Sequence, residues 1–201
     1  GTPWGLGLAV SADGKVAVAG SNKGTLNGAT NGPLNSGESG SFAENTDSFV
    51  TVYDADGQEI WTARRGARQD DAATQVAFGA DGTVYVAGNT KSVMPGSSAI
   101  GGQDSYIQAF KPDVDSKGLV QPVFTQQFGA AGLDQAAGMV VDGTNLVTAT
   151  IEDGRAVRAR ATILARAAAD AIAPGVRPRG PYGSHLCRRR PRSVPAGYAK
   201  G

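Results

Sequence analysis

The chain has 201 residues, of which 40% are hydrophobic, 29 are glycine and one is cysteine. This length suits one medium-sized domain or part of a longer repeat array. No stretch approaches the ~18–20 consecutive apolar residues of a membrane-spanning helix, and the single Cys187 excludes an internal disulfide. The chain begins at Gly1 without a methionine or a visible signal peptide, which suits a processed chain or a fragment.

The net charge of +1 conceals a division of the chain into an acidic and a basic part. Residues 1–150 hold 8 Lys and Arg against 15 Asp and Glu, whereas residues 151–201 hold 11 against 3. The two parts therefore carry net charges of −7 and +8. Such a division is typical of a tail with an electrostatic partner.

The first predicted strands belong to half of a repeat. The sequence LAVSADGKVAVAGSNK opens the chain, and its alternating small and apolar residues around an Asp-Gly turn predict strands at 7–10 and 15–19. The following segment, Ser21–Thr46, is rich in Asn, Gly and Ser. It predicts a long surface loop.

A full copy of the repeat runs from Asp47 to Ser92. Apolar residues that alternate between the two faces predict strands at 49–53, 58–63, 73–78 and 83–87. The sequences DADG and GADG lie between the paired strands, and Asp and Gly are the residues that tight turns favour. This copy therefore predicts four short antiparallel strands.

A second copy, residues 104–150, predicts strands at 106–110, 123–128, 138–141 and 145–149. Several marks recur between the two copies: Gly66 with Gly129, Asp71 with Asp134, Ala73 with Ala136, and Gly82 with Gly143. Four short strands per repeat are typical of a propeller blade. We therefore predict an all-β fold, a partial β-propeller of about two and a half blades: a half blade at 7–20 and blades at 47–92 and 104–150. Its predicted core is Phe49, Val52, Ile60, Val76, Phe78, Val84, Val86, Ile107, Phe110, Phe124, Val140 and Leu146.

The sequence of the repeat resembles that of a known family. The run DSFVTVYDADGQEIW, then G-x-x-x-D-D, then DGTVYVAGNT is similar to the bacterial seven-bladed β-propeller repeat often called SBBP. The resemblance covers Gly7 to about Thr150. It implies a propeller fold and a location outside the cell or at its surface. In its overall sequence the chain also resembles, more loosely, a bacterial regulator of flagellin gene expression.

The repeat changes character in the tail, residues 151–201. Glu152–Val157 is predicted to be a turn that enters a new strand, but an Ala-, Arg- and Pro-rich sequence follows. Its composition is compatible with an out-of-frame segment or with a disordered tail. A third possibility is a basic amphipathic helix that presents Val157, Ala161, Leu164, Ala168 and Ile172 on one face. Arg188–Arg192 could then contact phosphates.

Catalytic patterns are missing from the sequence. The only histidine, His185, lies beside Cys187 in the tail, where nothing predicts a pocket. No metalloprotease, hydrolase or P-loop motif occurs. We therefore expect no enzyme, no catalytic residues and no cofactor.

Carboxylates in the repeat have a simpler explanation than metal binding. Asp54 with Asp56 and Asp113 with Asp115 have D-x-D spacing, yet neither pair offers the six or so oxygen ligands of calcium. Turn formation explains both pairs. Asp70–Asp71 is predicted to lie in an inter-strand turn, and Trp4 and Trp61 are predicted to pack in blade cores.

Three functions stay open on this basis. The first is a non-enzymatic surface or secreted module that binds proteins through blade loops or open strand edges. The second is a regulator of flagellin expression, acting indirectly inside the cell, because the acidic repeat region lacks a DNA-reading motif. The third is a fragment of a propeller enzyme whose catalytic residues lie in other blades.

Overall fold

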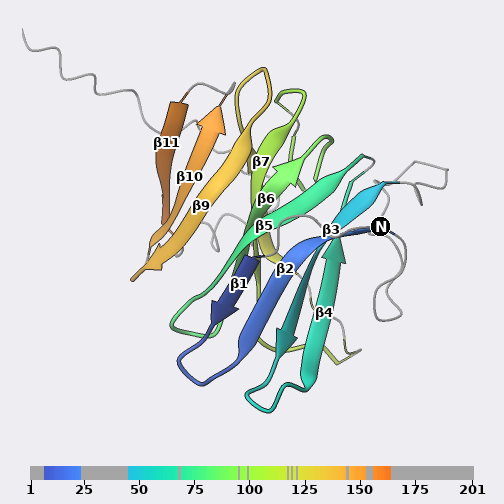
Figure 1. Cartoon of the computed structure of the whole chain (residues 1–201), viewed down its shortest axis with the longest axis vertical. Helices are drawn as coiled ribbons and strands as arrows, with labels where there is room; N and C mark the ends of the chain where they lie inside the picture. The colour runs from blue at the N-terminus through green and yellow to red at the C-terminus, as the bar shows by residue number, and fades with distance from the viewer. Residues whose placement is uncertain are drawn as a thin grey trace, which may run out of the picture.

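The computed structural model describes residues 7–23 and 45–163, apart from 68, 95, 99, 117, 119, 121, 144 and 153–155, and for 65 and 156–163 it describes the backbone alone. Every regular element in these ranges is a β-strand (Figure 1), which confirms the all-β prediction. The strands are β1 (Gly7–Val10), β2 (Val16–Lys23), β3 (Thr46–Tyr53), β4 (Glu59–Arg65), β5 (Asp71–Phe78), β6 (Val84–Thr90), β7 (Asp104–Phe110), β8 (Pro122–Phe128), β9 (Gln135–Asp142), β10 (Asn145–Glu152) and β11 (Ala156–Ile163).

The strands form three antiparallel sheets. Sheet 1 has the order β1-β2-β3-β4, sheet 2 the order β5-β6-β7-β8, and sheet 3 the order β11-β10-β9. Each of the ten strands predicted between residues 7 and 150 overlaps an observed strand. Local alternation and turn residues were therefore sufficient to locate them.

The predicted grouping of strands into blades was wrong. The repeat 47–92 does not form one sheet: β3 and β4 complete sheet 1, whereas β5 and β6 begin sheet 2. The predicted half blade is likewise the first half of a complete four-stranded sheet, because β2 pairs with β3 from Val16↔Tyr53 to Lys23↔Thr46. The sequence of a repeat does not show which of its strands is the first strand of a sheet. The pairing of β2 with β3, across a long connection, shows that each sheet begins in the middle of the repeat as we had divided it.

The predicted tail also began too early. Residues 156–163 form β11, which pairs with β10 from Asn145↔Ile163 to Glu152↔Ala156. A new strand therefore does follow Glu152, as the sequence predicted, and the helix predicted from Val157 is wrong as far as Ile163. Pairing with the open edge of β10 decides in favour of the strand. The rest of that predicted helix, and Arg188–Arg192, lie outside the described residues.

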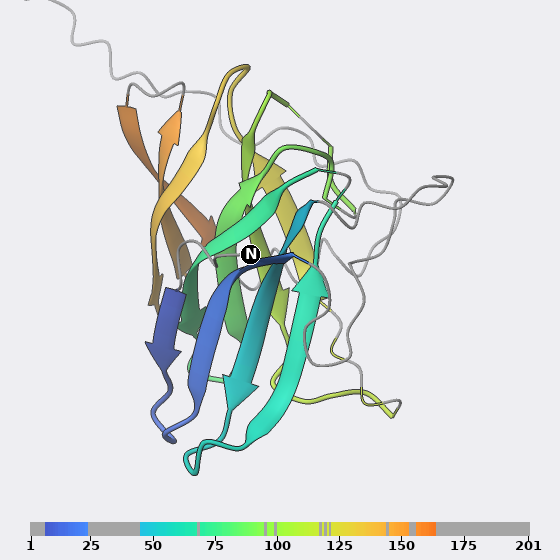
Figure 2. The same cartoon turned by 45° about the vertical axis from the view of Figure 1, so that its right-hand side comes forward.

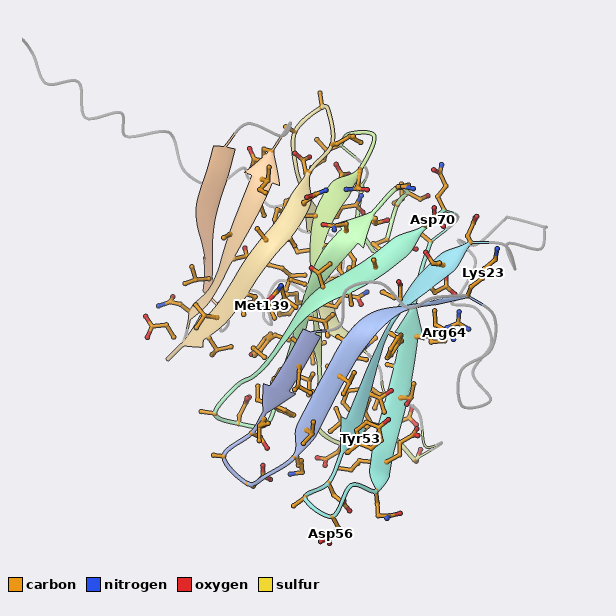
Figure 3. The ribbon with its side chains drawn as sticks, viewed as in Figure 1. Lys23, Tyr53, Asp56, Arg64, Asp70 and Met139 are labelled. Atoms are coloured by element: carbon orange, nitrogen blue, oxygen red, sulfur yellow. The ribbon has the colours of Figure 1, made fainter. Side chains whose placement is uncertain are left out.

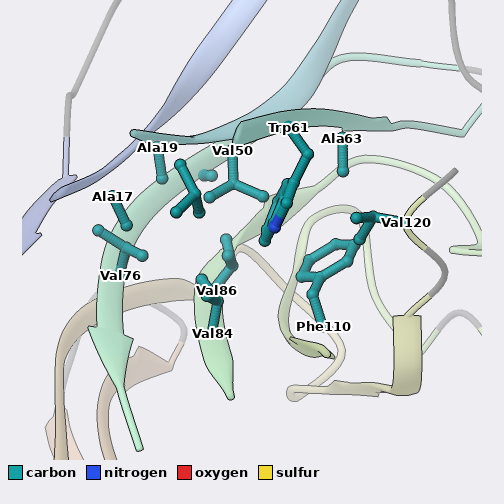
Figure 4. Close-up of a cluster of buried hydrophobic side chains, with 12 residues drawn as sticks. Ala17, Ala19, Val50, Trp61, Ala63, Val76, Val84, Val86, Phe110 and Val120 are labelled. Atoms are coloured by element: carbon teal, nitrogen blue, oxygen red, sulfur yellow. The ribbon is translucent and has the colours of Figure 1, made fainter. Parts of the chain in front are cut away.

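The three sheets stack in the order 1, 2, 3. The front of each sheet is the face that points along the stack from sheet 1 toward sheet 3, and the back is the opposite face. The back of sheet 1 and the front of sheet 3 are therefore the two outer faces. The front of sheet 1 packs on the back of sheet 2 in one apolar cluster (Figure 4). Trp61 lies in this cluster, as predicted, with its ring centroid 6.0 Å from that of Phe110. Its Nε1 donates a 2.9 Å hydrogen bond to the carbonyl of Pro112. Sheet 1 contributes Ala17, Ala19, Val50, Val52, Trp61 and Ala63, sheet 2 contributes Ala73, Val76, Val84, Val86 and Phe110, and the β7–β8 connection contributes Val120.

A second cluster joins the front of sheet 2 to the back of sheet 3. Its buried members are Tyr85, Ala87, Ile107, Ala109, Phe124, Phe128, Ala136 and Leu146. Strand β7, in the interior of the middle sheet, is buried along its whole length. Sheet 2 is thus covered on both faces.

Most of the predicted core is confirmed, with two corrections. Val52, Val76, Val84, Val86, Ile107, Phe110, Phe124 and Leu146 are buried, and Phe49 and Phe78 are half-buried. Ile60 and Val140 are instead 39% and 56% exposed. Both lie on the outer faces of the stack, against which the described residues place no further sheet.

The first strands of the sheets lie next to one another. Strand β5 contacts β1, β2 and β3, and strand β9 contacts β5, β6 and β7. Figures 1 and 2 both show the sheets arranged in this way, with β1, β5 and β9 nearest to one another. The β4–β5 and β8–β9 connections consequently meet the same end of the stack, where the polar groups described next are concentrated.

Candidate functional site

Two junctions carry most of the buried charge in the described part of the chain. The first junction is formed by Asp47, Arg64, Gly66 and Asp71, where the chain passes from sheet 1 to sheet 2. The second junction is formed by Asp104, Gln127, Gly129 and Asp134, where it passes from sheet 2 to sheet 3. The repeated sequence marks anticipated the glycine and the second aspartate of each junction. They did not anticipate Asp47, Asp104, Arg64 or Gln127, although DS opens both copies.

An ion pair holds the first junction together. Nη2 of Arg64, on β4, lies 3.0 Å from Oδ2 of Asp47, on β3, and the two side chains are 1% and 6% exposed. The same Nη2 donates a 3.3 Å hydrogen bond to the carbonyl of Asn22. Burial lowers the pKa of Arg64, and the charge of Asp47 opposes this effect. Figure 3 places Arg64 at the end of sheet 1 where Lys23 and Asp70 also lie.

Amide groups replace the ion pair in the second junction. Gln127 occupies on β8 the register position that Arg64 occupies on β4, since they pair with Tyr106 and Phe49. Nε2 of Gln127 donates a 2.7 Å hydrogen bond to Oδ2 of Asp104. The side chain of Asp104 also accepts hydrogen bonds from the backbone N–H groups of residues 100 and 101, at 2.8 and 2.9 Å. Three neutral donors therefore surround this carboxylate.

The second aspartate of each junction closes the connecting loop. Oδ2 of Asp71 accepts a 2.5 Å hydrogen bond from the N–H of Ala67, and Oδ2 of Asp134 accepts one of 2.7 Å from Ala130. The two aspartates are 1% and 0% exposed. Each carboxylate thus binds, from a buried position, the N–H group four residues before it.

Asp71 has an unusual environment for a carboxylate. Burial raises its pKa to about 7, the hydrogen bonds that its side chain accepts oppose this, and the charges of Asp47 and Asp70 add to it. Its Oδ1 has no hydrogen-bond partner among the described residues. The buried hydroxyl of Tyr106 has none either, and burial raises its pKa above the ordinary value. The junction therefore favours a neutral Asp71.

The shared glycines leave room for these carboxylates. A Cβ on Gly66 would lie 2.0 Å from Oδ1 of Asp47, and a Cβ on Gly129 would lie 2.1 Å from Oδ2 of Asp134. No side chain fits at such distances. This close approach explains why glycine marks the same place in both copies.

The adjacent carboxylates of Asp70 and Asp71 do not form a site together. Asp70 is directed outward, where Lys91 Nζ lies 3.0 Å from its Oδ2 and the N–H of Thr46 donates to its Oδ1 at 3.1 Å. These hydrogen bonds, that of Lys91 first, lower the pKa of Asp70. Asp70 lies in the connection between β4 and β5, as predicted, whereas Asp71 is instead the first residue of β5.

The D-x-D sequences lie in turns. Oδ1 of Asp54 accepts hydrogen bonds of 3.0 and 2.8 Å from the N–H groups of Asp56 and Gln58, and Gly57 has a φ of 80°. The carbonyl of Asp115 accepts a hydrogen bond from the N–H of Gly118. Within the described ranges, no three His, Cys, Asp or Glu side chains are placed to share a metal ion. His185, Cys187 and Trp4 lie outside those ranges.

Sheets 1 and 2 enclose no ligand-sized cavity among the described residues. A shallow gap between them has no room for even a water molecule, and its lining is Ser48, Phe49, Val50, Ala63, Val86, Gln108 and Phe110. The buried polar groups of both junctions hold backbone and neighbouring side chains, which is a structural role.

The chain is similar to a regulatory protein. It is 51% identical over 156 residues to "Regulatory protein FlaEY" of Caulobacter vibrioides, a match that covers 76% of this chain and 16% of that relative. The chain thus spans about one sixth of the relative's length. No family model matches the chain. The described residues contain no helix that is long and apolar enough to cross a membrane.

Proposed function

We propose that this chain is a non-enzymatic β-propeller module with a regulatory role, exercised through protein binding. The propeller is supported by three successive antiparallel sheets that stack face to face. Their first strands lie side by side, since β5 contacts both β1 and β9. Blades arranged around an axis have this relationship.

The regulatory role is supported by the 51% identity to Regulatory protein FlaEY. We propose that the chain influences flagellin expression, the role that the sequence resemblance implies. The net charge of −7 on residues 1–150 disfavours direct contact between this part of the chain and nucleic-acid phosphates. We therefore infer an indirect effect, through another protein.

Protein binding is favoured over catalysis by the distribution of side chains. The buried carboxylates of both junctions are engaged in holding loops and strands, as Asp47 and Asp104 show. Apolar side chains are exposed instead, among them Leu8 and Val10 on β1, at 67% and 65%. Exposed apolar residues that cluster on one face commonly mark protein interfaces.

A chimera tests this proposal. The segment of Caulobacter FlaEY that matches this chain would be replaced by the chain, and flagellin transcript and protein would be measured in a strain that lacks FlaEY. We expect regulation close to that of intact FlaEY. A segment of equal length and scrambled sequence serves as the control.

Failure of the folded chimera to restore regulation would contradict the regulatory role. Specific binding of the purified chain to flagellin promoter DNA would contradict an indirect effect. Cell fractionation provides a further check, since an exclusively extracellular location is incompatible with intracellular regulation and would favour the secreted module.

A further inference from the structure

The back face of sheet 1 is an open apolar surface. Leu8 and Val10 on β1 are 67% and 65% exposed on this face. Phe49 and Tyr53 on β3 lie on the same face and are half-buried. Their sequence neighbours Val50 and Val52 point the other way, into the cluster shared with sheet 2. We name this surface, formed by Leu8, Val10, Phe49 and Tyr53, the open back face.

The same positions are covered in the middle sheet. Leu8 pairs with Val18 as Val76 pairs with Val86, so Leu8 and Val76 are equivalent. Val76 is 8% exposed, and Tyr106, the equivalent of Phe49, is 0% exposed. Val76 packs in the cluster that sheet 1 shares with sheet 2. The open back face therefore carries apolar residues at the same positions as the back of sheet 2, which sheet 1 covers.

The complementary surface is present at the other end of the stack. Val140 on β9 is 56% exposed on the front of sheet 3 and pairs with Val147. It is equivalent to Ala9, which pairs with Ala17 in sheet 1. Ala9 packs against the cluster that contains Val76. We name the surface of Val140, Val147 and Ala149 the open front face.

We infer that these two open faces are the halves of one interface, and that a second copy of the chain occupies them. Sheet 3 of one copy would pack on sheet 1 of the other, as sheet 1 packs on sheet 2 within the chain. Val140 of one copy would then meet Leu8 of its partner. Two copies would repeat this contact twice and bring together six sheets, within the four to eight blades typical of a closed propeller.

The inference rests on the geometry of the stack and is independent of the regulatory role. Removal of apolar side chains as exposed as Leu8 and Val10 from water favours association. Both faces carry small or apolar residues at the register positions that pack between sheets within the chain. Association of this kind joins different faces, and it closes in a ring of two copies if the rotation between the copies brings the second pair of faces together.

Sedimentation velocity of the full chain provides the first test. We expect a dimer at ~100 μM that dissociates on dilution, as an interface of moderate affinity requires. Leu8→Asp should abolish the dimer. The matched control is Leu133→Asp, because Leu133 is also exposed, at 64%, but lies in the β8–β9 connection. A wild-type monomer at this concentration, or equal effects of both variants, would overturn the inference.

Cysteine cross-linking provides a second test, which does not depend on a destabilising charge. With Cys187→Ser as background, Leu8→Cys and Val140→Cys proteins would be mixed and mildly oxidised. We expect disulfide dimers to form efficiently in the mixture and poorly with either variant alone. Efficient cross-linking of Leu8→Cys with itself, or none in the mixture, would show that these faces do not meet head to tail.

Discussion

Arg64 and Asp47 form a buried ion pair, 3.0 Å apart, at the position where the next sheet has Gln127 and Asp104. In this second pair the neutral Gln127 donates a 2.7 Å hydrogen bond from its Nε2 to Oδ2 of Asp104. One sheet thus satisfies its buried carboxylate with a cation and the other with amides. Buried ion pairs often stabilise little overall, yet the loss of one partner costs much.

The first prediction concerns replacement of Arg64. Arg64→Ala leaves Asp47 buried without its cation, so the free energy of unfolding should fall by about 3–5 kcal/mol. Arg64→Gln should cost clearly less, because an amide at the equivalent position holds Asp104. Urea unfolding, followed by tryptophan fluorescence, measures both variants. Equal losses would show that charge compensation, rather than hydrogen bonding, dominates this junction.

The second prediction concerns pH and Asp71. Its pKa is raised from 3.8 to about 7 in the folded protein, so the folded state retains a proton that the unfolded state has released. This contribution is fully present below the unfolded pKa and disappears as pH rises through 7. Between pH 4 and 7 it should lower stability by up to about 1.4 kcal/mol per pH unit.

Asp71→Asn should remove this component, while its side-chain oxygen can still accept from Ala67. The variant should therefore gain stability relative to wild type as pH rises from 5 to 8, which unfolding curves in urea at each pH would measure. Asp70→Asn is the control. Its carboxyl has a lowered pKa, so its contribution is present above the unfolded pKa and changes little over this range. Parallel wild-type and Asp71→Asn profiles would contradict the prediction.

The third prediction concerns the close packing around Gly88. A Cβ there would lie 2.1 Å from the carbonyl oxygen of Ala72 and 2.7 Å from the hydroxyl of Tyr106. Gly88→Ala should therefore force β5 and β6 apart and cost about 1–3 kcal/mol or more. Thermal unfolding followed by circular dichroism measures the loss.

Gly102→Ala is the matched control for this substitution. The nearest atoms to a Cβ at Gly102 are 3.7 Å away, which is ordinary contact. It should change stability by less than about 1 kcal/mol. A similar loss for both substitutions would show that glycine is needed for reasons other than space.

The fourth prediction concerns Trp61, which joins sheets 1 and 2. Trp61→Ala removes the contact with Phe110 and the hydrogen bond to Pro112, and should cost about 3–5 kcal/mol. Trp61→Phe keeps most of the apolar contact and should lose about 1–2 kcal/mol, mainly through the hydrogen bond. Chemical unfolding followed by circular dichroism compares them. If Trp61→Phe were as damaging as Trp61→Ala, the indole N–H would be the dominant contribution.

The sequence located the strands because their signals are local. Alternation such as that of Phe49, Thr51 and Tyr53 spans a few residues. The turn at Asp54–Gly57 is formed by its own side chain and a positive φ, as its composition predicted. Most of the core followed for the same reason, since the face of a strand can be read from its alternation. Ile60 and Val140 were exceptions, because burial also requires a neighbouring sheet.

The sequence by itself determined the all-β class, the position of ten strands, and the repeated glycine and aspartate of each junction. Only the tertiary structure decided which strands share a sheet, that residues 156–163 add a strand to β10, and that Asp47 lies beside Arg64 and Gly66. Strand pairing across a long connection depends on contacts between residues distant in sequence. The same is true of the charge that each buried carboxylate meets, and a local pattern does not contain that information.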